Sequence, residues 1–570
     1  MLHRPGGSKV TWYSCGPTVY DAAHIGHART YVCTDIVRRV LEDVLALEVD
    51  FAMGVTDVDD KIIARAQATG FREWHDMERM VRGLEDDFFA DLDALHVRRP
   101  TAVLRVTEHI PDIIRYIEAI LRAGRAYVAP DGVYFDVVAC GDAYLHFKER
   151  GLPGMATARP LDADAASEQA PLPSDEAEPA GAPGSFKRDP RDFALWKVLK
   201  RPGEEPGWAS PWGLGRPGWH IECSAVTHAY FGPRLDLHSG GVDLKFPHHT
   251  NEVAQCAAHN CADHADWVAH WLHTGHLYIE GRKMSKSLKN FVSIREYLAA
   301  GYSSQPAADF RVFCLQHKYH SSVHFSRKCI EDAAAYRRKI EGFVSLVDTV
   351  ATGRQQAHPG GGAGPGAAAG AARRPTDESR KLLAYLSSTR TEVRRALLHD
   401  FDTPEVLRFV SYLVGEGTLY ASAVANRPAE PLEPLLGVAH YVADLLGKLG
   451  VPVGARTAIS VAEGVSDASV GGPSASAAQV LQTMVAFRTK VRASALKGFK
   501  GLKAASTKSL AAPDVTAAAA TMSDGAVGAG EALKEVLEAC DWLRDTACPA
   551  VGVQIDDVSD KLSAIKSAKK

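Results

Sequence analysis

The chain has 570 residues, of which 46% are hydrophobic and 24% are charged, and its formal net charge is -4 at pH 7. This length predicts three or four globular domains with sizeable cores, and the slightly acidic balance excludes overall basic charge as an argument for nucleic-acid binding. The 10 cysteines lie at irregular spacings, which argues against a disulfide framework and favours a reducing intracellular compartment.

The first 60 residues predict the opening of a nucleotide-binding α/β unit. An apolar strand at 9–15 precedes a loop at 16–27 that contains Gly and Pro. A helical stretch follows at 28–47, where apolar residues recur every three or four positions. A second strand lies within 49–60, so we expect a parallel sheet with crossover helices.

Three changes of composition divide the rest of the chain. Residues 155–186 are rich in Ala, Pro, Asp and Glu, which predicts a disordered inserted loop. Residues 352–376 are rich in Gly, Ala and Pro and predict a flexible tether, and a similar but shorter stretch occupies 461–477. Between these two tethers the periodicity of 376–450 predicts amphipathic helices in a bundle.

A tetrapeptide with two histidines, His24, Ile25, Gly26 and His27, lies in the loop before the first predicted helix. A helix N-terminus attracts phosphate through its free N–H groups and its dipole. Imidazoles there can donate hydrogen bonds to developing charge, and Gly26 lets the backbone approach a nucleotide closely. The competing interpretation is a pair of surface or capping histidines, and the tetrapeptide alone does not decide between the two.

A second motif, Lys283-Met284-Ser285-Lys286-Ser287, offers two lysines that could bind the phosphates of ATP and offset the charge on leaving pyrophosphate. A solvated basic loop is the competing interpretation. No Walker-type phosphate loop occurs in the sequence, which excludes the corresponding kinase or GTPase mechanism.

Four residues form a candidate metal site. Cys15 ends the first strand, Cys223 lies far downstream, and His248 and Glu252 are four positions apart, on one face of a helix. Two thiolates, one imidazole and one carboxylate suit zinc and disfavour magnesium or calcium. The long spacings match no zinc finger, so ordinary buried thiols are the alternative.

Two further residues compete as ligands, His249 and Cys256, the latter one helical turn beyond Glu252. The remaining cysteines are expected to be plain core or surface thiols: Cys33, Cys140, Cys261, Cys314, Cys329, Cys540 and Cys548.

The chain resembles the cysteinyl-tRNA synthetases, a family of class I aminoacyl-tRNA synthetases, and its tail resembles eukaryotic members. Five segments carry the resemblance in the family's order: WYSCGPTVYDAAHIGHART, GVTDVDDKIIARA, GRPGWHIECSA, LDLHSGGVDLKFPHHTNEVAQ and HTGHLYIEGRKMSKSLKNF. The chain departs from the family pattern at Thr250, where many relatives have an acidic residue, and in the insertion at 155–186. Neither departure touches a proposed ligand.

The resemblance implies an α/β fold: a Rossmann-like class I catalytic core with an inserted connective domain, followed by an α-helical anticodon-binding bundle. The implied parts are a first half of the core (1–108), the connective domain with its loop (109–205), a second half with the metal site (206–280), a stem-contact region (281–351), the tether (352–376), the helical domain (377–460), a linker (461–477) and a C-terminal tRNA-binding region (478–570).

The resemblance also implies that Cys15, Cys223, His248 and Glu252 hold one zinc ion, which the substrate thiol binds directly as thiolate. A bound zinc ion deprotonates a thiol, whereas a serine hydroxyl is a poor ligand, so this contact would reject serine without an editing domain. Four protein ligands exceed the usual three of a catalytic zinc, so the carboxylate would loosen or the ion become five-coordinate.

Other roles follow from the same resemblance. The catalytic residues are His24, His27, Lys283 and Lys286. The ATP site comprises these four residues with Gly26, and with Asp243 near the ribose. The amino-acid pocket comprises Cys15, Gly16, Thr56, Trp219 and His238. Trp219 could instead be a packing residue that shields the metal.

The implied activity is that of a cysteine–tRNA ligase. L-Cysteine would react with ATP, accompanied by Mg²⁺, to give cysteinyl-adenylate, and the cysteinyl group would pass to the 3′ end of tRNA(Cys), by class resemblance to the 2′-OH. Arginines and lysines of the helical region would contact tRNA.

Two alternatives remain open at this point: an ATP-dependent cysteine ligase acting on a small amine, and an inactive tRNA-binding relative. We expect a soluble protein, because the sequence has no signal peptide and no apolar run of about 18 residues. Its expected location is the cytoplasm, with mitochondria as the second choice.

Overall fold

The structure is a computed structural model of the chain. It describes residues 9–71, 74–141, 144, 186–200, 205–260, 267–279, 282–283, 291–357, 375–427, 430–453, 553–559 and 562–567. The chain divides into two compact units, 1–455 and 456–570. Most of the predicted loop at 155–186, most of the tether at 352–376 and all of the linker at 461–477 lie outside the described residues.

The first unit is built on a five-stranded sheet in which every neighbouring pair is parallel. Its strand order is β3-β2-β1-β8-β9. The strands are β1 (Val10–Ser14), β2 (Val49–Val55), β3 (Ala102–Arg105), β8 (Leu235–Gly241) and β9 (Val268–Thr274). Apolar runs such as VTWYS are mostly buried, as expected for a parallel sheet covered on both faces. The predicted α/β class is therefore confirmed.

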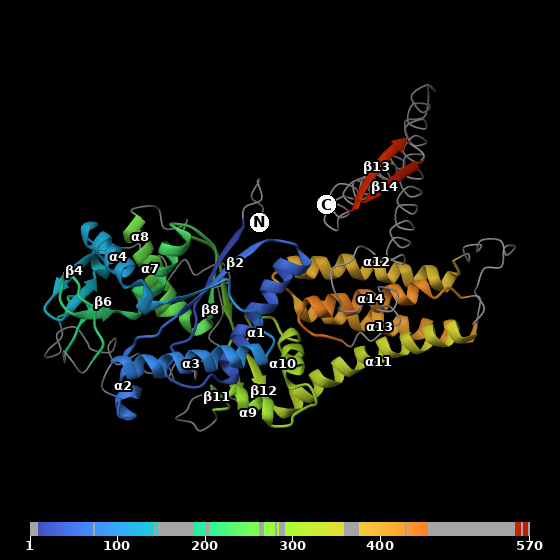
Figure 1. Cartoon of the computed structure of the whole chain (residues 1–570), viewed down its shortest axis with the longest axis horizontal. Coiled ribbons are helices and arrows are strands. Elements are labelled where there is room, and N and C mark those ends of the chain that lie inside the picture. The colour runs from blue at the N-terminus through green and yellow to red at the C-terminus, as the bar shows by residue number, and fades with distance from the viewer. Residues whose placement is uncertain are drawn as a thin grey trace, which may run out of the picture. The chain divides into compact units, whose positions relative to one another are not determined.

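Helices connect these strands in crossovers (Figure 1). The predicted first helix is α1 (Ile25–Arg39), which continues as a π-helical turn, η1 (Val40–Val44), before β2. Two helices form the next crossover, from β2 to β3: α2 (Asp60–Ala68) and α3 (Trp74–Ala94). A 3-10 turn, η2 (Val106–His109), follows β3. Because β1 lies between β2 and β8, the chain changes direction across the sheet at β1, and the crevice at the carboxyl ends of such strands is the usual ligand site.

An antiparallel sheet of order β4-β5-β6-β7 interrupts the parallel one. Its strands are β4 (Ala126–Ala129), β5 (Gly132–Phe135), β6 (Phe193–Val198) and β7 (Gly215–Pro217), accompanied by α4 (Ile110–Arg122) and α5 (Val137–Cys140). The chain then returns through α7 (Trp219–Phe231) to β8. Two short turns and a helix follow β8: η4 (Val242–Leu244), η5 (Lys245–His249) and α8 (Thr250–Asn260).

The remainder of the first unit is mainly helical. A small sheet of β10 (Leu277–Ile279), β11 (Arg282–Lys283) and β12 (Val323–Phe325) lies beside α9 (Ile294–Ala299) and α10 (Pro306–Leu315). Four long helices then pack as the predicted bundle (Figure 1): α11 (Arg327–Ala357), α12 (Asp377–Leu398), α13 (Thr403–Asn426) and α14 (Glu433–Lys448). α11 continues to Ala357, beyond residue 352 where the tether was predicted to begin, because its apolar face stays packed as far as Ala351.

The second unit contains one described feature, an antiparallel hairpin of β13 (Val553–Ser559) and β14 (Leu562–Ser567). The sequence analysis assigned no element there. Among the described helices, none combines the length and the apolar character needed to span a bilayer.

The buried carboxylate of Asp35 fixes α1 within this fold. Asp35 is 3% exposed and accepts hydrogen bonds from Arg311 Nη1 of α10 at 2.5 Å, Arg39 Nε at 2.7 Å and the backbone N–H of Arg98 at 2.9 Å. Although burial alone would raise the pKa of Asp35, Arg311 and Arg39 hold it below its usual value. The carboxylate therefore joins the helix that carries His24 and His27 to two neighbouring segments.

We predict that Asp35→Asn lowers the free energy of unfolding at pH 7 by about 3 kcal/mol, because it leaves the buried Arg311 without its counter-charge. Since the folded pKa is depressed, the carboxylate's contribution is complete above the unfolded pKa of about 3.9 and is lost as the pH falls through the folded value. Urea unfolding of both proteins between pH 3 and 7 measures the difference, which should shrink only at the acidic end.

Asp332→Asn is the matched control, since Asp332 pairs with Lys328 on α11 but both side chains are more than half exposed. An equal loss in both variants would contradict a special role for Asp35.

Candidate active site and metal centre

A cavity of about 570 Å³ opens at the carboxyl ends of the central strands. Cys15 follows β1, Thr56 follows β2 and Gly241 ends β8, and all three line the cavity. This volume lies in the range of sites that enclose a small molecule and a cofactor. The cavity therefore occupies the position that the strand order favours.

Gly16 allows the strands to approach one another at this point. A Cβ atom at Gly16 would clash with the carbonyl oxygen of Gly54, which belongs to β2. A residue with a side chain would push the loop after β1 away from β2, and with it Cys15 and the cavity wall. Gly16 itself lines the cavity.

The candidate metal site adjoins the cavity: Cys15, Cys223 and His248 line it, and Glu252 lies behind them. One donor atom each from Cys15, Cys223, His248 and Glu252 lies within 4.8 Å of the others, and all four residues are buried. The two Sγ atoms are 3.8 Å apart, and His248 Nε2 lies 3.4 Å from Cys223 Sγ and 3.0 Å from Glu252 Oε1. The four-residue spacing in the sequence thus brings imidazole and carboxylate together, across the junction of η5 and α8.

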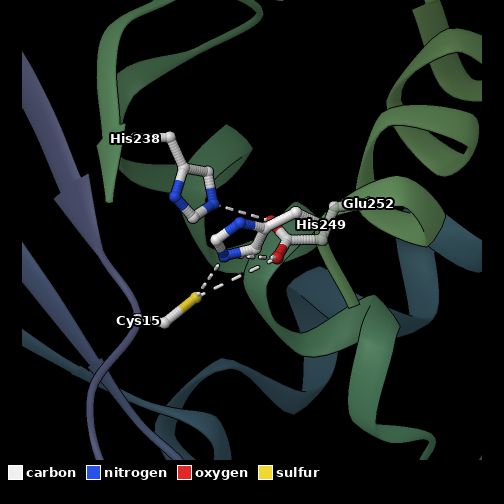
Figure 2. A group of neighbouring side chains, drawn as sticks. All are labelled: Cys15, His238, His249 and Glu252. Atoms are coloured by element: carbon white, nitrogen blue, oxygen red, sulfur yellow. Dashed lines mark hydrogen bonds and ion pairs between the residues drawn. The ribbon is translucent and has the colours of Figure 1, made fainter. Parts of the chain in front are cut away.

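A second set of donors shares two of these residues. One donor atom each from Cys15, His238, His249 and Glu252 also lies within 4.8 Å of the others. Figure 2 shows these four side chains pointing toward one another. His249 Nε2 is 3.4 Å from Cys15 Sγ and 3.9 Å from Glu252 Oε1. Because both sets use Cys15 and Glu252, they are alternative positions for one ion. The set with Cys223 has two sulfur donors instead of one, which favours zinc.

The other rival ligand, Cys256, lies in neither set. Its thiol accepts a hydrogen bond from the Tyr116 hydroxyl at 3.2 Å, and burial raises its pKa above the usual range. Cys256 thus has a partner of its own, and it contributes no donor atom to either four-residue set.

The charges of the cluster suit a divalent cation. A hydrogen bond from Cys15 lowers the pKa of Cys223 to about 6, whereas burial raises that of Cys15. Burial alone would raise the pKa of Glu252, but His238 and His248 hold it well below its usual value. Despite burial, Cys223 and Glu252 raise the pKa of His248 to about 10, so a bound metal would displace a proton from this ring. The donor set fits zinc.

Aromatic and imidazole rings support the donors from behind. His220 Nδ1 lies 3.0 Å from His248 Nδ1, and the Trp219 ring stacks on His248 at 4.4 Å. His249 Nδ1 lies 2.8 Å from His273 Nε2. The sequence analysis missed His220 and His273. The doublet of histidines in FPHHTNE indicated two neighbouring rings, but no pattern indicated the residues packed behind them.

The wall beside the centre contains most of the predicted amino-acid pocket. Cys15, Gly16, Thr56 and Trp219 line the cavity. His238 is not among the residues that line this cavity, and its Nε2 lies 2.8 Å from Glu252 Oε2. It projects from β8 and positions the carboxylate of Glu252, so its predicted contact with the amino acid stays a prediction.

A buried carboxyl group that the sequence analysis missed also lines this wall. Glu222 is 3% exposed, and its Oε2 accepts a hydrogen bond from Thr56 Oγ1 at 2.9 Å. Burial, followed by the neighbouring Cys223 and Asp59, raises its pKa well above the usual value. Its position immediately before Cys223 was the only available signal in the sequence.

His24 and His27 also line the cavity. His24 is the N-cap of α1, and each ring accepts a backbone N–H at Nδ1, from His27 at 3.2 Å and from His24 at 3.3 Å. The rings stack with centroids 3.8 Å apart. Burial lowers the pKa of His27 to about 4, so this ring is neutral and carries its proton on Nε2, where it can donate.

The remaining nucleotide-site predictions have mixed outcomes. Asp243 lines the same cavity, near the end of β8. Gly26 is not among the lining residues and lies in the first turn of α1 between the two histidines. Lys283 is described only as backbone, in β11, and Lys286 lies outside the described residues.

Comparisons with known proteins identify the family of the catalytic domain. Residues 2–335 match the family model of the tRNA synthetases class I (C) catalytic domain. A probable mitochondrial cysteine–tRNA ligase of Xenopus tropicalis is 38% identical over 492 residues, 85% of this chain and 75% of the relative. The cytoplasmic cysteine–tRNA ligase of Dictyostelium discoideum is 35% identical over 554 residues, 97% of this chain and 73% of the relative.

A similarity among solved structures supports the fold alone. The methionyl-tRNA synthetase of Mycobacterium tuberculosis bound by methionyl-adenylate superposes with a TM-score of 0.57 at 16% identity, covering 78% of this chain and 92% of that one. The matched catalytic domain spans more than half of the chain, and two relatives exceed 30% identity over most of their length. The chain therefore belongs to the cysteine–tRNA ligases, a family of class I aminoacyl-tRNA synthetases.

Proposed function

We propose that this chain activates L-cysteine with ATP and transfers the cysteinyl group to the 3′ end of tRNA(Cys). The observation that carries the proposal is one cavity lined by two chemically different clusters. Cys15, Cys223 and His248 form one cluster, and the stacked rings of His24 and His27 form the other. A small thiol-containing amino acid and a nucleotide would thus meet between them.

One zinc ion per chain is part of the proposal, held by Cys15, Cys223, His248 and Glu252. When bound, zinc supplies a Lewis acid that converts a ligated thiol to thiolate, which a serine hydroxyl does not match. The residues of the chain supply the rest: His238 orients Glu252, and Trp219 and His220 hold the ring of His248.

The activation step requires positioning and charge stabilisation. The substrate carboxylate attacks the α-phosphate of ATP and displaces pyrophosphate, and the ring of His24 and the neutral ring of His27 donate hydrogen bonds toward that phosphate. Lys283 and Lys286 offset charge on the β- and γ-phosphates, Asp243 contacts the ribose, and Mg²⁺ accompanies the nucleotide. No general base is needed, because the attacking carboxylate is already ionised.

The helical bundle is proposed to contact tRNA. Arg390, Arg394 and Arg395 of α12 are exposed, and each can neutralise a phosphate. The corresponding basic segment at 486–503 lies outside the described residues. Of the two locations given for the relatives, we propose the cytoplasm for this chain.

ATP–pyrophosphate exchange tests the proposed function. Purified protein should exchange pyrophosphate with cysteine and not with serine, and a zinc chelator should abolish the exchange. The charging of tRNA(Cys) transcript, measured separately, should follow the same dependence. Exchange without charging would favour ligation to a small amine, and the absence of cysteine-dependent exchange would favour an inactive tRNA-binding relative.

Two single variants test the choice of ligands. Cys223→Ser should lose stoichiometric zinc and reduce the preference for cysteine over serine by at least about 100-fold, because the hydroxyl is a poor ligand. His249→Ala should keep its zinc, measured by elemental analysis of the purified protein. Loss of zinc from His249→Ala with retention in Cys223→Ser would instead support the set that contains His238 and His249.

His27→Ala should lower kcat for exchange about 100-fold with little change in the KM for cysteine, since one transition-state donor is removed. Because burial lowers the pKa of His27 to about 4, the ratio of wild-type to variant kcat should stay constant between pH 6 and 8.

His320→Ala is the matched control, an exposed histidine paired with Asp400 that should leave exchange unchanged. A kcat ratio that changes with a midpoint near pH 6.5 would mean that His27 titrates as an ordinary histidine.

A further inference from the structure

Glu222 is a buried carboxyl group whose charge no neighbour balances through an ion pair. It lies in the first turn of α7, is 3% exposed and lines the cavity. Its Oε2 accepts one hydrogen bond, from Thr56 Oγ1 at 2.9 Å. Within the described part of the chain, Glu222 has no ion-pair partner and no second hydrogen-bond donor.

Other buried carboxylates in the described part of the chain have an ion-pair partner or at least two hydrogen-bond donors: Asp57 accepts two bonds from Thr107, and Asp192 accepts three from neutral groups. Glu85, which is equally buried, accepts from Arg105 at 2.6 Å, and Asp309, which is 0% exposed, accepts from Arg337 at 2.6 Å. The carboxylate of Glu252 contacts two histidines. Burying an ionised carboxylate without such a partner is costly, so a carboxyl group that faces a cavity in this state is suited to a cationic ligand.

The ligand expected in this cavity carries one cation. An amino acid has an α-ammonium group with three donor hydrogens, and in cysteine only two carbon atoms separate that group from the sulfur. Glu222 immediately precedes Cys223, the residue proposed at the sulfur end, and both line the same wall. A thiol directed to Cys223 would therefore leave the ammonium group within reach of the neighbouring carboxylate.

We propose that Glu222 binds the α-ammonium group of the amino-acid substrate, with Thr56 orienting the carboxylate. This inference deepens the proposed function and rests on it. The ammonium would complete the charge balance of Glu222, and a charge-assisted hydrogen bond in a buried site is stronger than a neutral one. Glu222 thus recognises the amino group, whereas the proposed zinc site that includes Cys223 recognises the sulfur.

The hydrogen bond between Thr56 and Glu222 also joins the end of β2 to α7, so a purely structural role is the competing explanation. Glu222→Gln separates the two roles, because the amide has the same shape and its oxygen can still accept from Thr56. A structural defect would weaken every ligand equally, whereas loss of an ammonium site weakens only ligands that carry an ammonium group.

Calorimetric titration of the zinc-loaded full-length protein tests the proposal with three thiols. Cysteine and cysteamine carry an amino group, and 3-mercaptopropionate lacks it. For Glu222→Gln we expect the Kd of cysteine and of cysteamine to rise at least about tenfold, and that of 3-mercaptopropionate to change by less than about twofold. Zinc content should equal that of the wild type.

Glu85→Gln is the matched control, since it removes an equally buried carboxylate away from the cavity and should leave all three Kd values unchanged. A parallel rise for all three thiols in Glu222→Gln, or no rise for any, would overturn the proposal. Binding is measured without ATP, so it does not depend on the exchange activity. If Glu222→Gln weakened only the thiols with an amino group while the wild type showed no exchange, the proposed activity would be overturned and the ammonium site retained.

Discussion

The buried carboxylate of Glu252 is the interaction on which the site depends. Its side chain is fully buried, and its two oxygens contact His238 of β8 at 2.8 Å and His248 of η5 at 3.0 Å. An ionised carboxylate could not remain there without these partners. The same contacts hold α8 against the sheet and place two imidazoles and a carboxylate opposite Cys15. The contacts that pack α8 against the sheet are therefore the same contacts that set the geometry of the candidate centre.

Strand order supplies the other half of the arrangement. Because β1 pairs with β2 on one side and with β8 on the other, the loop after β1 lies at the point where the sheet changes direction. Cys15 therefore lines the cavity, and the same loop leads directly to His24 and His27, which line it too. The contacts of Asp35 hold the helix that follows. A thiol and an imidazole nine residues apart in the chain thus belong to two different clusters of one cavity.

Local spacing and motif context predicted the elements that depend on short-range structure. The order of strand, loop and helix between residues 9 and 47 and the helical bundle after the tether are confirmed, because apolar periodicity indicates them. The predicted boundary was wrong: α1 begins at Ile25, inside the predicted loop, because His24 caps it, and it gives way to η1 after Arg39. The choice between His248 and His249 could not be made from the sequence, since it depends on the turn of η5 and on Phe246, whose backbone interrupts that turn. The position of His238 behind Glu252 and the exposure of Glu222 to the cavity depend on tertiary packing and have no local signal.

The protonation of the cluster explains how such a site can fold before it receives a metal ion. The pKa shifts favour ionised Cys223 and Glu252, a protonated Cys15 thiol and a protonated His248 ring, which together carry one negative charge. In the proposed zinc-bound form, an ion that displaced the protons of Cys15 and His248 would leave the same net charge. The buried surroundings therefore enclose the same net charge with and without the ion. The two protons also reduce the repulsion between the donors in the metal-free site. In the metal-free protein, the protons on Cys15 and His248 thus balance the charge that the cation would balance.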